Sequence, residues 1–86
     1  MYEVILAKDA IKYYKKSDAK MKKMLNECFV NLKENPKNNV NVKRLEGKLE
    51  GLYRYRIRDI RVIYEVIDNR VEVHVLDIGN RGDIYK

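Results

Sequence analysis

The N-terminal part of the chain changes from a short apolar run to two helical patterns. Residues 2–7 are rich in β-branched and aromatic side chains, which predicts a strand. Apolar residues then recur at helical spacing through Lys8–Lys16. A second amphipathic pattern follows Ser17-Asp18, a favourable pair of N-cap and first-turn residue, and ends at Pro36. Because the link between the two patterns is short, we expect an antiparallel helical hairpin that packs one apolar face on a sheet.

The apolar positions of the second helix recur at intervals of three and four residues, at Met21, Met24, Leu25, Cys28 and Leu32. Methionine fills irregular gaps between packed side chains, so we interpret both methionines as core residues rather than as a recognition surface.

The C-terminal half has a period of two instead. Residues 35–42 are polar and rich in turn formers, and Gly47 and Gly51 suit turns better than a helix interior. Three strand-like runs and the two tight turns between them follow, at Leu52–Arg58, Asp59-Ile60, Arg61–Ile67, Asp68-Asn69 and Val71–Ile78. These runs predict a three-stranded antiparallel meander.

The order of strand, helical hairpin and three-stranded antiparallel meander predicts an α+β fold. Helices are expected to cover one face of the sheet and to leave the other partly open, which makes the open face the place to look for function. The 86 residues contain no internal repeat and no low-complexity segment. We therefore expect a single domain that spans residues 1–86.

Charge narrows the possible partners. Nineteen Lys and Arg residues against thirteen Asp and Glu residues give a net charge of +6, which favours nucleic acid or an acidic protein without choosing between them. Cys28 and His74 are each the sole residue of their type, so we predict no disulfide, no metal and no cofactor. No signal peptide and no apolar run of about 20 residues is present, so we expect a cytoplasmic protein without a membrane partner.

The first strand of the meander carries alternating arginines. Its period of two places Arg54, Arg56 and Arg58 on one face, spaced about 6.5–7 Å apart along the strand. This spacing is close to that of phosphates along a single nucleic-acid strand, and like charges so arranged repel unless an anion lies between them. Two interpretations stay open, an anion-binding face and a solvated face neutralised by nearby carboxylates.

Two segments of the chain closely resemble the RelE family of toxin endoribonucleases, in the RelE/ParE toxin superfamily. They are LYRYRIRDIRVIYEV at residues 52–66 and VLDIGNRGDIY at residues 75–85, and the Ile-Gly-x-Arg-x-x-x-Tyr motif that ends at Tyr85 is the most specific part. The N-terminal strand and hairpin, Asn35-Pro36 and the Arg44-Leu45-x-Gly47 stretch fit the family as well. The resemblance thus covers nearly the whole chain and implies the RelE-like small toxin fold over residues 1–86.

The resemblance implies the toxin of a type II toxin–antitoxin system. Such a toxin is a ribosome-dependent endoribonuclease that cuts mRNA in the ribosomal A site, by metal-free attack of the ribose 2′-hydroxyl on the adjacent phosphate, and so inhibits translation. A RelB-like antitoxin is the protein partner that the resemblance implies. The expected catalytic residues are Arg54, Arg56, Arg61, Arg81 and Tyr85, and the further expected RNA contacts are Arg44, Lys48 and Arg58.

The resemblance also gives these residues roles. Arg61 and Arg81 match arginines that hold the scissile phosphate and stabilise its growing charge, and Tyr85 matches a tyrosine that stacks on or orients the nucleotide. Arg54 and Arg56 stand where RelE has two lysines with general-base and charge-stabilising roles. Arginine, with a pKa above about 12, keeps the phosphate contact but is a poor proton acceptor. His74 is another potential base, and we interpret it as structural because it lies mid-strand, away from the family's site.

Two further functions remain open. A ParE-like toxin would poison DNA gyrase as a binding protein and would lack the RNase residues, which the presence of Arg81 and Tyr85 argues against. A noncatalytic module would bind nucleic acid or an antitoxin only. Because the chain ends one residue after Tyr85, we also expect no C-terminal helix of the kind found in longer relatives, and no regulation through its displacement.

Overall fold

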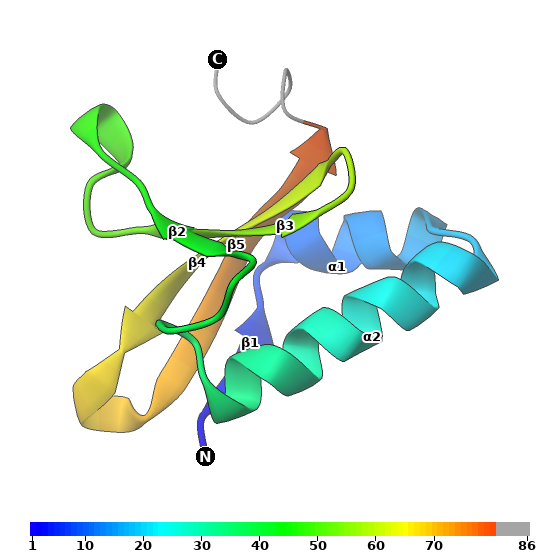
Figure 1. The fold of residues 1–86 in the computed structure, drawn as a ribbon. Helices are drawn as coiled ribbons and strands as arrows, with labels where there is room; N and C mark the ends of the chain where they lie inside the picture. Colours follow the sequence, from blue (N-terminus) through cyan, green and yellow to red (C-terminus); the bar gives the residue numbers. More distant parts are fainter. Residues whose placement is uncertain (81–86) are drawn as a thin grey trace.

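The structure is a computed structural model that describes residues 1–80. A strand, two helices and four further strands follow one another along the chain, with two short 3-10 turns, η1 and η2, between strands (Figure 1). The elements are β1 (Glu3–Leu6), α1 (Lys8–Lys16), α2 (Ala19–Glu34), β2 (Val42–Arg44), η1 (Gly47–Leu49), β3 (Tyr53–Ile57), β4 (Ile60–Ile67), η2 (Asp68–Arg70) and β5 (Glu72–Asn80).

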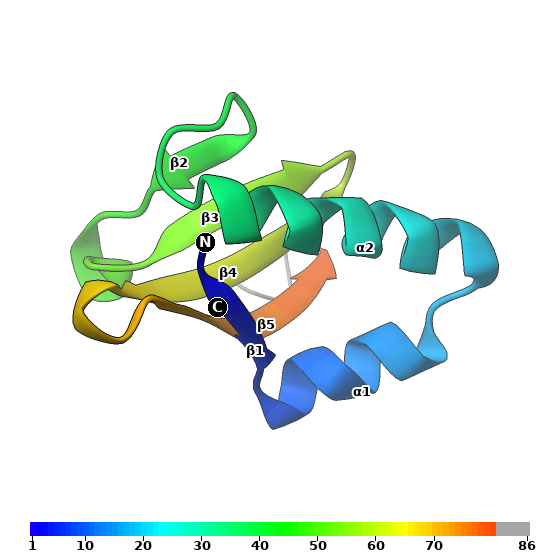
Figure 2. The same ribbon diagram turned by 90° about the horizontal axis from the view of Figure 1, so that it is seen from below.

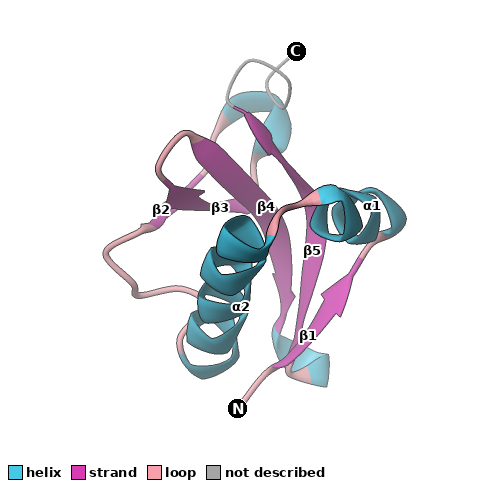
Figure 3. Cartoon of the chain, turned by 90° about the vertical axis from the view of Figure 1, so that its right-hand side faces the viewer, coloured by secondary structure: helices cyan, strands magenta, loops and turns pink. Residues whose placement is uncertain are grey.

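The strands form one five-stranded sheet in the order β1-β5-β4-β3-β2. The edge strand β1 runs parallel to β5, with Val4 opposite Val73, and all other neighbours are antiparallel. Both helices lie on one side of the sheet (Figure 3), and they form the expected hairpin, with their connection at one end of the molecule (Figure 2). The α+β class, the helical hairpin and the β3-β4-β5 meander are therefore confirmed.

The Ser17-Asp18 pair ends one helix and begins the next. The Ser17 hydroxyl donates to the carbonyl oxygen of Tyr13 at 2.8 Å, and the Asp18 Oδ1 accepts from the backbone N–H of Met21, also at 2.8 Å. The second contact satisfies one of the free N–H groups at the start of α2, which is the reason that aspartate is favoured there.

The core lies between the helices and the sheet. Leu25 and Leu32 of α2, Val62 and Tyr64 of β4, and Val73 of β5 have no exposed surface. The buried Tyr64 hydroxyl donates to the carbonyl oxygen of Pro36 at 2.6 Å, so the segment after α2 is tied to the centre of the sheet. Burial raises the pKa of the Tyr64 phenol, which keeps this donor protonated.

Three details of the expected strands are wrong. Residues 42–44 form strand β2, where only a linker was predicted, because three residues with a single apolar side chain give no readable period. Strand β3 ends at Ile57 and β4 begins at Ile60, so the turn is Arg58-Asp59 rather than Asp59-Ile60, and Arg58 has a left-handed φ of 52°. Val71, with φ of 54°, also belongs to a turn, so that β5 begins one residue later than expected and continues to Asn80.

None of the helices that the structure describes has the length and apolar character needed to cross a membrane.

Candidate functional site

The sheet face turned away from the helices, called the open face below, carries the meander's arginines. Residues paired across adjacent strands lie on the same face, and Arg54 is paired with Lys43 on one side and Ile63 on the other. Arg56 is paired with Arg61 of β4. The structure thus brings together three of the five expected catalytic residues, Arg54, Arg56 and Arg61, beside Lys43.

Arg54 is half-buried at the centre of this group. Its Nε is fully covered and has no hydrogen-bond partner among residues 1–80. A buried N–H donor normally has an acceptor, and a charged one gains more from it than a neutral one. The unmatched donor of Arg54 therefore favours an anionic ligand at this place on the open face.

Arg56 and Arg61 bring two positive charges opposite each other. Arg56 is exposed, and its Nε donates to the carbonyl oxygen of Arg58 at 3.2 Å. The Arg61 side chain is only 7% exposed. Directly opposite residues of antiparallel strands have Cβ atoms about 5 Å apart, so this pairing brings two guanidinium-bearing side chains to one place on the open face.

No carboxylate among residues 1–80 forms an ion pair with Arg54 or Arg56. Within residues 1–80, the ion pairs join Lys37 to Asp68 at 2.7 Å and His74 to Glu72 at 2.9 Å. Neither Arg54 nor Arg56 takes part in one. No carboxylate of residues 1–80 therefore neutralises these two arginines, which favours an anion-binding face over a solvated face balanced by the acids of that part of the chain.

His74 lies on the open face but far from the arginines. It is paired with Glu65, four positions along β4 from Arg61, which corresponds to about 13 Å. Its Nε2 is held by Glu72. This position and this partner agree with a structural role.

The remaining expected residues lie in several places. Arg44 and Lys48 are exposed on β2 and η1, but Arg44 is paired with Tyr53 and so belongs to the helix side of the sheet.

Lys43, which sequence reasoning missed, lies beside Arg54 on the open face. Alternation in β2 would have revealed it had that strand been recognised. Arg58 leaves the open face because its turn interrupts the alternation. Arg81 and Tyr85 lie outside the described residues.

No group of three or more His, Cys, Asp or Glu side chains suited to a metal ion occurs among residues 1–80. The single cysteine, Cys28, is buried in the core, where burial raises the pKa of its thiol and keeps it protonated.

Comparison with known proteins decides the family. The model of a family described as the ParE toxin of the type II toxin–antitoxin system parDE matches residues 4–85. The chain belongs to this toxin family. No curated protein sequence matches the toxin.

Solved structures show the same fold. Escherichia coli RelE in the intact RelBE toxin–antitoxin complex is 27% identical to the toxin, with a TM-score of 0.79 over 93% of the toxin and 96% of RelE. RelE in the archaeal RelE–RelB complex from Pyrococcus horikoshii is 29% identical, with a TM-score of 0.80 over 94% and 96% of the two chains. The YoeB/ParE toxin from Agrobacterium tumefaciens shares the fold at 19% identity, with a TM-score of 0.81 over 92% of the toxin and 98% of that chain. The toxin is a RelE-like member of the RelE/ParE superfamily, as its resemblance predicted.

Proposed function

We propose that the toxin is a ribosome-dependent endoribonuclease that cuts mRNA in the ribosomal A site and thereby inhibits translation. The observation that carries this proposal is the unmatched, buried Nε–H of Arg54 among the like-charged side chains of the open face. The 27–29% identity to the two RelE chains supports it.

The open face suits a phosphodiester under attack by the neighbouring 2′-hydroxyl. Negative charge grows on the phosphate oxygens during this step, and cations that are already in place stabilise that charge without reorganising. Arg54, Arg56 and Arg61 supply such cations from two adjacent strands. In this proposal Arg81 shares the phosphate and Tyr85 orients the nucleotide, while Lys43 and Lys48 contact the RNA toward the β2 edge of the sheet.

The open face is better suited to stabilising negative charge than to accepting a proton from the 2′-hydroxyl. The arginines are poor bases, and His74 lies about 13 Å along the sheet from Arg61. The proposed catalysis therefore depends on holding the 2′-hydroxyl in line with the bond that breaks and on stabilising the charge on the phosphate. Each effect can lower the activation barrier by about 3 kcal/mol or more.

The proposed partner is an acidic, RelB-like antitoxin. RelE occurs with RelB in the E. coli and P. horikoshii complexes. A net charge of +6 favours an acidic binder, and any partner that binds only the folded toxin stabilises it.

The test is to express the toxin in cells without an antitoxin and to map new 5′ ends of mRNA. Arg54→Ala should lower the rate of cleavage by roughly 10²-fold or more, since removal of one preorganised donor commonly has that effect. Arg70→Ala is the matched control, because Arg70 is exposed in η2, at the far end of β4 from the arginine group. Equal cleavage by wild type and Arg54→Ala would overturn the assigned site.

The match to a ParE family model favours a second candidate, poisoning of DNA gyrase. In that case growth stops while mRNA stays intact, and gyrase-dependent DNA breaks appear instead. If neither growth arrest nor cleavage follows expression, the toxin fold acts here as a binding module.

A further inference from the structure

A β-bulge in β5 changes which of its side chains reach the open face. Ile63 and Tyr64 are neighbours in β4, but their partners in β5 are Asp77 and Val75, so that Leu76 is an extra residue between them. Uninterrupted alternation from Val75 would return Asp77 to the helix side, and the bulge places it on the open face instead. Bulges are common next to active sites, where they redirect a side chain.

Asp77 lies in the same row of the sheet as Arg54. Ile63 is paired with Asp77 on one side and with Arg54 on the other, so all three share the open face. Arg54 and Asp77 are therefore two strand spacings apart, which is about 10 Å. Arg61, two residues from Ile63 in β4, is the diagonal neighbour of Asp77. This arrangement leaves room for a ribose between a phosphate held by the arginines and the carboxylate.

The carboxylate of Asp77 is held in place but not neutralised. Its Oδ1 accepts a hydrogen bond from the backbone N–H of Ile78 at 2.9 Å, and the side chain is half-buried. Asp77 takes part in no ion pair among residues 1–80, and within that part of the chain its Oδ2 accepts no hydrogen bond. The second oxygen can therefore accept a proton from a bound ligand.

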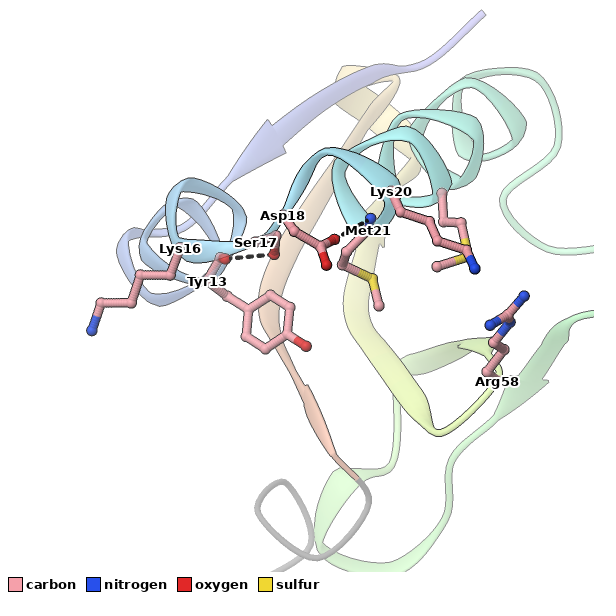
Figure 4. Close-up of a pocket in the computed structure, with 8 residues that line it drawn as sticks. Tyr13, Lys16, Ser17, Asp18, Lys20, Met21 and Arg58 are labelled. Carbon is pink, nitrogen blue, oxygen red and sulfur yellow. Dashed lines mark hydrogen bonds between the residues drawn. The ribbon is translucent and has the colours of Figure 1, made fainter.

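The groove on the helix side offers no competing base among its described residues. It has a volume of about 490 Å³ and is bounded by the end of α1, the first turns of α2 and the β3–β4 turn, from which Arg58 reaches toward the helices (Figure 4). Met21 and Met24 line it and are only half-buried, so the interpretation of both as core residues is wrong in part. Asp18, the one carboxylate among the described lining residues, is engaged as the N-cap of α2.

We propose that Asp77 is the catalytic base of the RNA cleavage, an inference that rests on the proposed function. Its carboxylate takes the proton of the 2′-hydroxyl as the 2′-oxygen forms a bond to phosphorus. The bond from phosphorus to the 5′-oxygen of the next nucleotide breaks, and that oxygen takes a proton from water. A 2′,3′-cyclic phosphate and a 5′-hydroxyl end result, and Asp77 returns its proton to the solvent. Asp77 thus supplies the proton acceptor that the arginines cannot be.

The test compares Asp77→Asn with wild type on ribosomes programmed with a short mRNA, with cleavage measured at saturating toxin. Asparagine keeps an oxygen that can accept the Ile78 N–H but does not act as a base, so cleavage should fall roughly 10²-fold. Binding of an mRNA whose 2′-hydroxyls are replaced by hydrogen, which cannot be cut, should stay unchanged. Glu65→Gln removes a carboxylate paired with His74 on the same face, and this matched control should cleave at the wild-type rate.

A second variant separates proton transfer from a structural role. Asp77→Ala should cleave as slowly as Asp77→Asn, and formate added to the reaction should raise its rate. A small carboxylate can occupy the vacated place and accept the proton, so formate should leave the wild-type rate unchanged.

Equal or faster cleavage by Asp77→Asn overturns the inference, because the carboxylate would then only reduce the positive charge of the open face. A parallel loss of binding, or the absence of rescue by formate, overturns it as well and assigns Asp77 to holding the RNA or the fold. Failure of the proposed function is distinguishable, because wild type itself would then leave the mRNA on programmed ribosomes uncut, and both proposals would be overturned together.

Discussion

The two faces of the sheet share one backbone but differ in what covers them. On the helix side, Val62, Tyr64, Val73 and Val75 have no exposed surface. On the open face, strands of the same sheet place Arg54 beside Lys43 and Arg56 opposite Arg61. Burial of one face holds the strands together, so that the other face can carry a density of like charge that an isolated sheet would not tolerate. Stability and function are therefore expected to respond to different substitutions.

The largest expected effect is on the covered face. Leu32→Ala removes a fully buried side chain of α2 and should lower the free energy of unfolding by about 3 kcal/mol, since the cavity cannot fully collapse. Urea denaturation measures this change. Val30→Ala on the same helix is the control, because Val30 is 52% exposed and its loss should change stability by less than about 0.5 kcal/mol.

A smaller effect is expected from the buried hydrogen bond of the same face. Tyr64→Phe keeps the packed ring but leaves the carbonyl oxygen of Pro36 without its donor, which should lower stability by about 1–2 kcal/mol. Thermal unfolding by circular dichroism can measure it. An unchanged midpoint would show that water replaces the phenol, and that the segment after α2 is less firmly attached than the 2.6 Å contact indicates.

Substitution on the open face should barely affect stability. Arg56→Gln removes one of two opposed charges, and we expect the free energy of unfolding to change by less than about 0.5 kcal/mol while RNA cleavage falls. Urea denaturation and cleavage are measured on the same preparation. A loss of stability comparable to that of Leu32→Ala would remove the contrast between the two faces.

The smallest effect is expected at an exposed cluster near the β4–β5 turn. A hydrogen bond from Lys37, at 2.7 Å, and a second from Tyr2 hold the pKa of Asp68 below its ordinary value. A lowered carboxyl pKa stabilises the fold above the unfolded pKa of about 4, and this contribution is lost as the pH falls through the lower, folded pKa.

Asp68→Asn should therefore lower the urea midpoint slightly at neutral pH, and the difference from wild type should vanish in acid. Asn69→Ala, next to Asp68 in η2, is the control, because it removes no titratable group and should leave the pH dependence unchanged. A difference that persists in acid would mean that packing, rather than the ionised carboxylate, is responsible.

The sequence predicts correctly those helices and strands that have a clear hydrophobic period and a clear capping or turn residue at their ends. The Ser17-Asp18 pair marks the start of α2 as predicted, with Asp18 rather than Ser17 as the N-cap, because an N-cap depends on a single side chain and the next few backbone groups. Strand β2 was missed because its pairing with β3 is set by a neighbouring strand rather than by its own three residues. Arg58 was placed on the wrong face because period counting assumes an extended backbone, and its left-handed φ breaks the count.

In the candidate site, too, local features could be predicted from the sequence and features that depend on a neighbouring strand could not. Alternation correctly placed Arg54 and Arg56 on one face, but the opposition of Arg56 and Arg61 needs the register of β3 with β4, which the hairpin turn fixes. The groove could not be found in this way, since it joins α1, α2 and a turn far away in the chain.

The parallel pairing of β1 with β5 at the edge of the sheet affects when the toxin can finish folding. Among the strands, β1 is synthesised first and β5 last, yet they are neighbours, and β5 lies between β1 and β4. Contacts so far apart in the chain form late and slowly. The sheet therefore cannot form completely until residues 72–80 have left the ribosome. Until then β1 has no strand to pair with, and the helices have only part of the sheet to pack on. A partner that is already present can therefore bind the chain before its sheet is complete.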